Sequence, residues 1–164
     1  MKGANLISEI GFDSWYSQAW KSCYRAVRAV TLNHADTEEV LSEAFTRAFT
    51  SLEELQDHVA PEAWVVRTAI NIHRDRNRKL NNAKRFLFAV NDTYEDQSNS
   101  LSEEMEKGLQ ALPLRQREVI ALRVILGLSS EETANHLGIS IPTVSTHLRR
   151  GLETMRKLLD GESK

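Results

Sequence analysis

The sequence predicts an all-α fold made of two small helical domains. Apolar residues recur at three- and four-residue spacing along most of the 164-residue chain, which is the pattern of amphipathic helices. No segment shows the alternation typical of a half-buried strand. A polar, acidic and turn-rich segment, NDTYEDQSNS, interrupts the helical pattern. We therefore expect a first domain over residues 1–85, a flexible acidic linker over 86–102, and a second domain over 103–164 that contains a helix-turn-helix.

Three helices are expected in the first domain. The first covers Phe12 to about Asn33, and Asp36 is expected to cap the second. Pro61 suits the start of the third, because an amide in the first turn of a helix needs no intrahelical partner. The side chains expected to face the core are Trp15, Ala19, Cys23, Ala26, Val27 and Val30, then Val40, Leu41, Ala44, Phe45, Ala48 and Phe49, then Trp64, Val65, Ala69 and Ile72.

The second domain is expected to begin with two helices separated by a break. One helix lies near residues 103–111, and the dipeptide Leu112-Pro113 ends it. The next helix runs from Arg115 to Leu126.

A tight turn then separates the last two helices. Ser129 or Ser130 caps the first of them, Gly138 ends it, and Ser140 caps the second, whose first turn tolerates Pro142. This pattern predicts a helix-turn-helix whose second helix is free to enter a major groove. A purely structural helical hairpin is the alternative. The second helix is expected to bury Val144, Leu148, Leu152, Met155 and Leu159 and to expose Thr143, Ser145, Thr146, His147, Arg149 and Arg150.

Charge is distributed in blocks, although the formal net charge is only -2. Residues 36–62 carry eight acidic side chains and one arginine, a net -7, whereas residues 65–85 carry seven basic side chains and one aspartate, a net +6. Residues 86–108 hold six acidic groups and one basic group, and residues 142–157 hold four basic groups and one acidic group. Such alternation indicates separate acidic and basic binding surfaces.

The composition indicates the cellular compartment and argues against a metal site or a membrane span. The single cysteine, Cys23, cannot form an internal disulfide, no Cys and His cluster has zinc-site spacing, and no stretch approaches 18 apolar residues. We therefore expect a cytoplasmic protein that is not inserted in a membrane and binds no metal.

No pattern in the sequence indicates an enzyme. His73 and Asp75 are two residues apart and would point to different faces of a helix. The sequence has no Gly-rich phosphate loop, nucleophile elbow or His-Glu-X-X-His motif. We expect no enzymatic activity, no cofactor and no small-molecule substrate.

Three segments carry a resemblance to a known family. The run DTEEVLSEAFTRAF at 36–49 resembles the polymerase-binding helix of the sigma-70 family, and PEAWVVRTAINIHRDRNRK at 61–79 resembles its promoter-melting helix. Residues 109–159, which include the helix-turn-helix, resemble the family's carboxy-terminal domain, which binds the promoter -35 element. With only these two domains, the chain is similar to the small extracytoplasmic-function sigma factors.

The resemblance implies an alternative sigma factor that binds core RNA polymerase and promoter DNA and is controlled by an anti-sigma protein. The residues implied are Glu38, Glu39, Glu43 and Arg47 for polymerase binding, Arg67, Asn71, Arg74, Arg78 and Lys79 for the -10 element and melting, and Thr143, Ser145, Thr146, His147, Arg149 and Arg150 for the -35 element.

The chain also departs from the family pattern. The loop SLEELQDHVAPEAW lacks the Arg-Gly residues and, apart from its last residue Trp64, the aromatic residues common in relatives, and Ser145 and His147 stand where Lys and Arg are frequent. Fewer phosphate contacts predict weaker binding to DNA by the protein alone. Two other interpretations remain: a dimeric helix-turn-helix regulator, since TVSTHL also resembles response-regulator effector domains, and a sigma-like mimic that titrates an anti-sigma protein.

Overall fold

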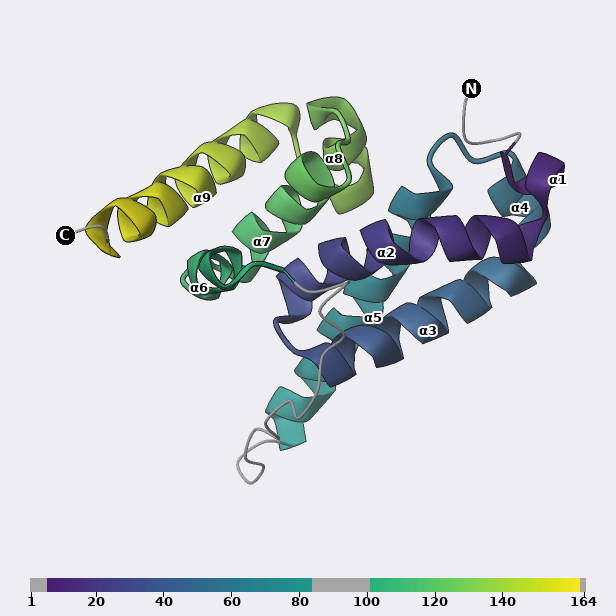
Figure 1. Cartoon of the computed structure of the whole chain (residues 1–164), viewed down its shortest axis with the longest axis horizontal. Coiled ribbons are helices and arrows are strands. Elements are labelled where there is room, and N and C mark those ends of the chain that lie inside the picture. Colours follow the sequence, from purple (N-terminus) through teal and green to yellow (C-terminus); the bar gives the residue numbers. More distant parts are fainter. Residues whose placement is uncertain (1–5, 84–100, 163–164) are drawn as a thin grey trace.

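The computed structural model describes residues 6–83, the N-terminal part, and residues 101–162, the C-terminal part (Figure 1). The N-terminal part contains α1 (Leu6–Ile10), α2 (Phe12–Thr31), α3 (His34–Thr50), α4 (Leu52–Gln56) and α5 (Pro61–Ala83). The C-terminal part contains α6 (Glu103–Gln110), α7 (Leu114–Ile120), the π-helical turn η1 (Ala121–Ile125), α8 (Ser130–Leu137) and α9 (Ile141–Glu162). Neither part contains a strand, which confirms the all-α prediction. Most of the linker predicted over 86–102 lies outside the described residues.

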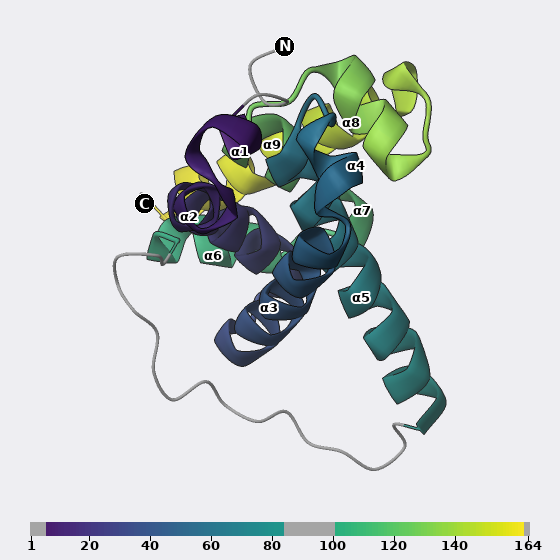
Figure 2. The same ribbon diagram turned by 90° about the vertical axis from the view of Figure 1, so that its right-hand side faces the viewer.

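The N-terminal part is built on three long helices that pack against one another. α2, α3 and α5 make mutual contacts, and the short helices α1 and α4, which the sequence did not predict, meet at one end of this group (Figures 1 and 2). Pro61 begins α5 as expected. The second helix begins earlier than expected, because Asn33 rather than Asp36 is its N-cap: the Asn33 side chain accepts a hydrogen bond from the Asp36 amide at 2.8 Å.

Aromatic side chains fill the space between α2 and α3. Trp15 is fully buried, its indole Nε1 donates to Glu62 Oε1 at 2.9 Å, and its ring lies 5.7 Å from that of Phe45. Phe49 was expected to face the core, but 59% of its surface is exposed. Phe49 lies in the last turn of α3, where it contacts Phe12 edge to face on the surface of the N-terminal part.

The helix predicted from Arg115 to Leu126 is present in a modified form. It runs as the α-helix α7 and changes at Ala121 to the π-helical turn η1, which ends at Ile125. The amide of Leu126 accordingly bonds to the carbonyl of Ala121, five residues earlier. The wider turn leaves Val124 48% exposed.

The buried face of α9 differs by one helical track from the predicted face. Val144, Gly151 and Met155 are buried, whereas Leu152 and Leu159 are 45% and 39% exposed. The reason is close helix packing: a Cβ on Gly151 would lie 2.9 Å from Ile120 Cδ1 of α7. Glycine therefore occupies the contact position that the sequence pattern assigned to leucine.

One hydrophobic core extends through both parts. α2 contacts α3 and α5 and also contacts α7 and η1 (Figure 1). Buried Cys23 of α2 belongs to the same cluster as Leu122 and Leu128 of the C-terminal part. Leu101 is also buried in this cluster, and Ser102 caps α6 by accepting a hydrogen bond from the Met105 amide at 3.2 Å. Ordered structure thus begins before residue 103.

His73 is a titratable side chain enclosed where α5 meets α3. It is 6% exposed, and its Nε2 lies 2.9 Å from Asn77 Nδ2. Burial lowers the pKa of His73, and Arg117 and Arg76 lower it further, while Asp36 opposes them.

Within the described ranges, no helix combines the length and apolar character needed to cross a membrane.

We predict that acidification destabilises the fold before the carboxylates titrate. Because the pKa of His73 is lower in the folded chain than its ordinary value of about 6.5, the neutral form is favoured on folding, and stability falls as the pH decreases through and below that value. Each unit of lowering corresponds to about 1.4 kcal/mol. The thermal midpoint should fall between pH 7.5 and pH 5, and His73→Gln should flatten this dependence. An equal slope in the variant would contradict the assignment.

Candidate nucleic-acid interface

The first helix of the helix-turn-helix is fixed by a reciprocal cap. The Ser129 hydroxyl accepts from the Glu132 amide at 3.0 Å, and the Glu132 carboxylate accepts from the Ser129 amide at 2.7 Å. These bonds lower the pKa of Glu132. Of the two serines proposed as the cap, Ser129 is therefore the one used.

The turn has the geometry that its residues predict. Gly138 ends α8 with φ 64°, in the left-handed region, and its amide bonds to the carbonyl of Ala134. Ser140 caps α9 by accepting from the Thr143 amide at 3.2 Å, which leaves Pro142 in the first turn. The predicted helix-turn-helix is confirmed.

The six residues proposed for reading the -35 element lie in the first ten residues of α9 but differ in their contacts. The Thr143 hydroxyl is 2.6 Å from that of Ser140, and the Ser145 hydroxyl donates to the carbonyl of Ile141 at 3.2 Å. Arg149 is exposed and pairs with Glu153 at 3.0 Å. Thr146, His147 and Arg150 lie on the same side of α9 as Thr143. Thr146 and His147 are half-buried, whereas Arg150 is exposed and has no ion pair in the described residues.

Four of the five residues proposed for the -10 element share one stripe of α5. Arg67, Asn71, Arg74 and Arg78 follow at intervals of four, three and four residues, and the last three line an open pocket of about 380 Å³ with Asp75. Lys79 is not part of this group, because it lines a different pocket beside Glu39 and His73.

Arg74 is held by the C-terminal part. It forms a bidentate pair with Glu118 of α7, through Nε at 2.6 Å and through Nη2. Glu118 has 0% exposure and also accepts from Arg115 Nη1 at 3.0 Å. Sequence reasoning missed Glu118 and Arg115. The only local signal was an acidic residue directly before the buried run Val119, Ile120 and Ala121.

Arg67 lies on the same side of α5, near α8. Its charge helps to lower the pKa of His136, after burial and the charge of His58. The rings of His58, in the loop before α5, and His136 are 6.0 Å apart. The C-terminal part therefore approaches the -10 stripe of α5 at two places.

The residues proposed for polymerase binding follow two tracks of α3. Glu39 and Glu43 both pair with Arg76 of α5, at 2.9 and 2.8 Å, and Glu43 also pairs with Arg47 at 2.6 Å. Hydrogen bonds and charge from Arg47 and Arg76 lower the pKa of Glu43. Glu38 stands apart, 3.7 Å from His34. The ion pairs of Glu39 and Glu43 with Arg76 were not predicted from the sequence.

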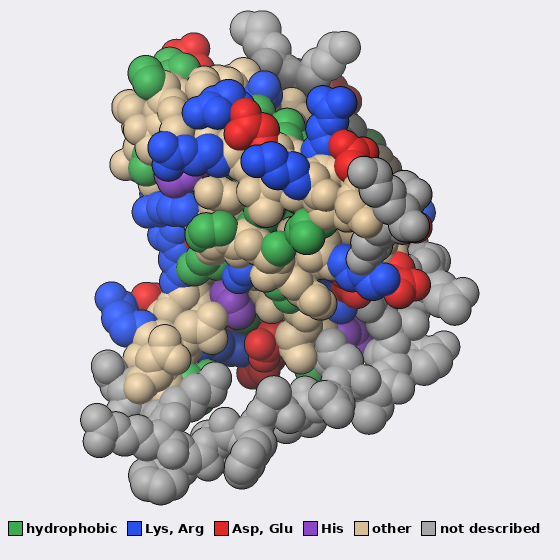
Figure 3. All heavy atoms as spheres, turned by 90° about the vertical axis from the view of Figure 1, so that its left-hand side faces the viewer, with side chains coloured by type: hydrophobic (Ala, Val, Ile, Leu, Met, Phe, Trp, Pro, Cys, Tyr) green, Lys and Arg blue, Asp and Glu red, His purple; other side chains and the backbone are tan. Residues whose placement is uncertain are grey.

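The surface also carries an aromatic groove and a face with many basic side chains. An aromatic groove of about 320 Å³ beside α3 is lined by Phe12, Tyr16, Ser42, Phe45, Thr46 and Phe49. Figure 3 views the molecule from the end where α6 and α9 lie, and Lys and Arg side chains are spread over the upper part of this face. The described residues contain no cluster of His, Cys, Asp and Glu able to hold a metal ion.

Comparisons with known proteins agree with this geometry. Residues 13–83 match the family model for sigma-70 region 2, and residues 102–155 match that for sigma-70 region 4. The chain is 29% identical to the extracytoplasmic-function sigma factor SigW of Bacillus subtilis, over 90% of this chain and 86% of that one. The chain belongs to the extracytoplasmic-function group of the sigma-70 family.

Further relatives support the same assignment. The RNA polymerase sigma factor CnrH of Cupriavidus metallidurans is 26% identical over 85% of this sigma factor and 81% of its own length. The fold is shown by RpoE of Bartonella quintana, solved with the anti-sigma factor NepR, with a TM-score of 0.75, 20% identity, and coverage of 91% and 96%. CnrH, solved with the cytosolic domain of CnrY, gives a TM-score of 0.65 at 23% identity, with coverage of 98% and 94%.

Family membership fixes the general activity. Sigma factors are non-catalytic transcription initiation factors, and this sigma factor directs initiation by core RNA polymerase at promoter DNA.

We predict that Arg150 and His147 of this sigma factor contribute differently to binding. If exposed Arg150 grips phosphate, Arg150→Ala should weaken binding to all promoters alike and lower the salt slope by roughly 1. His147→Ala should change the preferred -35 sequence, with discrimination near the low end of roughly 1–3 kcal/mol. Arg156→Ala, the same charge change further along α9, is the control. Selection from a randomised -35 library measures the sequence preference, and binding at several salt concentrations measures the slope. An altered consensus for Arg150→Ala and an unaltered one for His147→Ala would reverse the assignment.

Proposed function

We propose that this sigma factor opens promoters with the pocket on α5 and reads the -35 element with the first turns of α9. The observation that carries the proposal is the convergence of Asn71, Arg74 and Arg78 on one open pocket. In the proposed division, residues 1–85 serve polymerase and the -10 element, residues 103–164 serve the -35 element, and 86–102 joins them. The protein works in the cytoplasm and has no enzymatic activity of its own.

The pocket on α5 has the chemistry that melted DNA requires. An exposed amide such as that of Asn71 offers both a donor and acceptors to a base edge, while arginines hold the phosphates on either side. Capture of an unpaired base also needs a surface that replaces its stacking partner. The planar guanidinium of Arg78, 75% exposed, supplies one at the pocket wall.

An anti-sigma protein is part of the proposal. Both RpoE and CnrH, which share this fold, were solved bound to such proteins. Exposed apolar side chains on the outer track of α9, Leu152 and Leu159, offer one surface that a protein partner would bury.

The two alternative functions each leave part of the chain without a role. A dimeric regulator would need no counterpart of α3 and α5, and a mimic that titrates an anti-sigma protein would need no intact DNA-reading helix.

Run-off transcription tests the proposal directly. Purified chain added to core polymerase should yield transcripts from a matched promoter, selected from a randomised library. The double variant Asn71→Ala, Arg78→Ala should form holoenzyme without transcribing. A chain that binds promoter DNA without polymerase and yields no transcript with it would instead support the dimeric regulator.

We predict that Asn71 acts after the promoter is bound. Asn71→Ala should leave holoenzyme assembly and closed-complex binding intact and reduce permanganate reactivity of thymines near the start site by roughly tenfold, the loss of a contact worth about 1–2 kcal/mol. Asn81 is exposed near the end of α5 and does not line the pocket, so Asn81→Ala is the matched amide control. Wild-type reactivity in Asn71→Ala would move base capture to the loop over 51–60.

We predict that the acidic track of α3 docks on polymerase. Reversal of Glu39 and Glu43 to Lys should weaken affinity for core polymerase, but it also strands Arg76 beside two cations. Adding Arg76→Glu restores the two pairs at position 76 with their signs exchanged, although the lysine at 43 then lies beside Arg47. This triple variant should regain most of the thermal stability that the double variant loses and still bind polymerase weakly. Glu53→Lys with Glu54→Lys on α4 makes the same charge change elsewhere and should bind normally. Normal affinity in the triple variant would exclude this docking face.

A further inference from the structure

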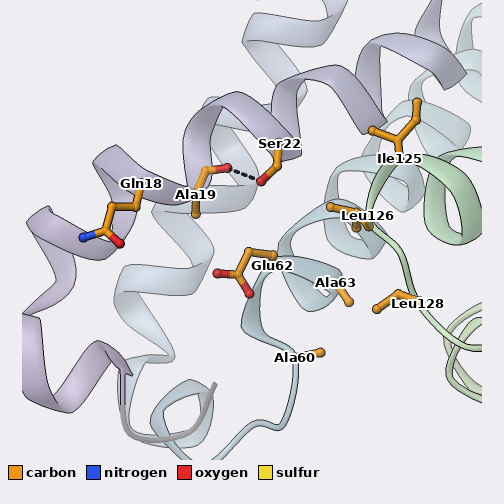
Figure 4. Close-up of a pocket in the computed structure, with 9 residues that line it drawn as sticks. All are labelled: Gln18, Ala19, Ser22, Ala60, Glu62, Ala63, Ile125, Leu126 and Leu128. Atoms are coloured by element: carbon orange, nitrogen blue, oxygen red, sulfur yellow. Dashed lines mark hydrogen bonds between the residues drawn. The ribbon is translucent and has the colours of Figure 1, made fainter. Parts of the chain in front are cut away.

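We propose that the cavity beside α2 and the start of α5 is a binding site for a small organic cation, a primary amine on a short aliphatic chain. The cavity has a volume of about 360 Å³, near the lower end of the roughly 300–1,000 Å³ typical of small-molecule sites. The proposal goes beyond the proposed function, because it concerns neither DNA nor polymerase. Figure 4 shows the walls of the cavity: Gln18 and Ser22 of α2, Glu62 of α5, and Ile125, Leu126 and Leu128 of the C-terminal part.

Glu62 brings a negative charge to this cavity, and no cation balances it among the described residues. Its Oε1 accepts a hydrogen bond from the indole Nε1 of buried Trp15 at 2.9 Å, which fixes the carboxylate. Its Oε2 has no hydrogen-bond partner, and Glu62 has no ion pair, within the same residues. Neither the bond to Trp15 nor the first turn of α5 requires a carboxylate inside a cavity, since glutamine would serve Trp15 and an outward-pointing acid would serve the helix. The charge and the second oxygen are therefore left for a ligand that is positive and donates hydrogen bonds.

Two further acceptors line the same cavity. The Ser22 hydroxyl donates to the carbonyl of Ala19 at 3.1 Å, so its own oxygen remains able to accept. The exposed side chain of Gln18 offers an amide oxygen. Together with Glu62, these side chains provide acceptors on three residues, and a primary ammonium group has three donors and no acceptor. Among the described residues that line the cavity there is no lysine or arginine, so an anion would meet the carboxylate without compensation.

The wall contributed by the C-terminal part is apolar and only partly covered. Ile125 and Leu126 are half-buried and Leu128 is 8% exposed, and all three line the cavity. Removal of aliphatic surface from water is favourable roughly in proportion to its area. A hydrated inorganic cation would gain nothing from this wall, whereas an alkyl chain attached to an ammonium group would cover it. Negative charge on one side and aliphatic surface on the other therefore favour an alkylamine.

Titration of the whole chain with hexylamine tests the proposal, and the indole N–H of Trp15 reports on binding. A cation at Glu62 draws charge from the carboxylate to which Trp15 donates, so the NMR signal of that N–H should shift and reach saturation. Because the chain has three tryptophans, Trp20→Phe and Trp64→Phe identify the signal of Trp15. The thermal midpoint should also rise with the amine concentration, since a ligand that binds only the folded chain stabilises it.

Matched ligands and variants separate the role of charge from that of the aliphatic chain. Hexanol lacks the charge, hexanoate reverses it, and methylamine lacks the chain, so each should bind at least about tenfold more weakly than hexylamine. Glu62→Gln keeps an acceptor for Trp15 and removes the charge, so it should weaken hexylamine binding by at least about tenfold. Glu54→Gln on α4 removes an exposed carboxylate that does not line the cavity, and it should leave hexylamine binding unchanged.

Each outcome supports or overturns the amine site. Saturable binding of hexylamine that Glu62→Gln weakens supports it. No saturable shift in the wild type, equal affinity for hexylamine, hexanol and hexanoate, or unchanged affinity in folded Glu62→Gln would overturn it. The ligand series needs only the wild type, so it decides the question even if Glu62→Gln does not fold. Because neither polymerase nor promoter DNA enters the experiment, failure of the amine site would leave the proposed function standing.

Discussion

The carboxylate of Glu118 lies where the two helical parts meet, and the arrangement of the chain depends on how its charge is satisfied. A buried carboxylate is costly by several kcal/mol unless hydrogen bonds and opposite charges surround it. Arg115 supplies one such partner from the same part, and Arg74 supplies the other from α5. Because Glu118 is fully buried, loss of either arginine would leave its charge only partly compensated. The pair with Arg74 therefore ties the position of α7 to that of α5.

α5 carries ion pairs to two of its neighbours, α7 and α3. Arg74 and Arg76 are two residues apart and leave the helix on different faces: the first meets Glu118 of α7, and the second meets Glu39 and Glu43 of α3. The proposed melting pocket thus shares its helix with the support for the proposed polymerase face. The two groups of ion pairs share no side chain, but both are anchored within the same turn of α5.

The sequence was sufficient for the helical class, the helix-turn-helix and the main helices, because these depend on local signals such as Pro61, Ser129 and Gly138. The sequence did not predict the features that depend on contacts between distant residues. Asp36 and Asn33 are both good caps, and the extended backbone at Asn33 selects between them. Leucine at 152 looks like a core residue until Gly151 is seen to set the distance between α9 and α7. The pair of Arg74 with Glu118 spans 44 positions of sequence, and no helical periodicity reports a contact of that range.

The division of α9 into two tracks bears on how such proteins diversify. Val144, Gly151 and Met155 hold the helix against α6 and α7, while the side chains proposed to touch DNA lie on the opposite tracks. Substitutions at the exposed positions among them, Ser145, Arg149 and Arg150, would alter the proposed contacts with DNA at little cost in stability, since exposed positions contribute little to folding. After gene duplication, a copy of this chain can therefore acquire a new set of target promoters by a few outward mutations, without passing through an unfolded ancestor.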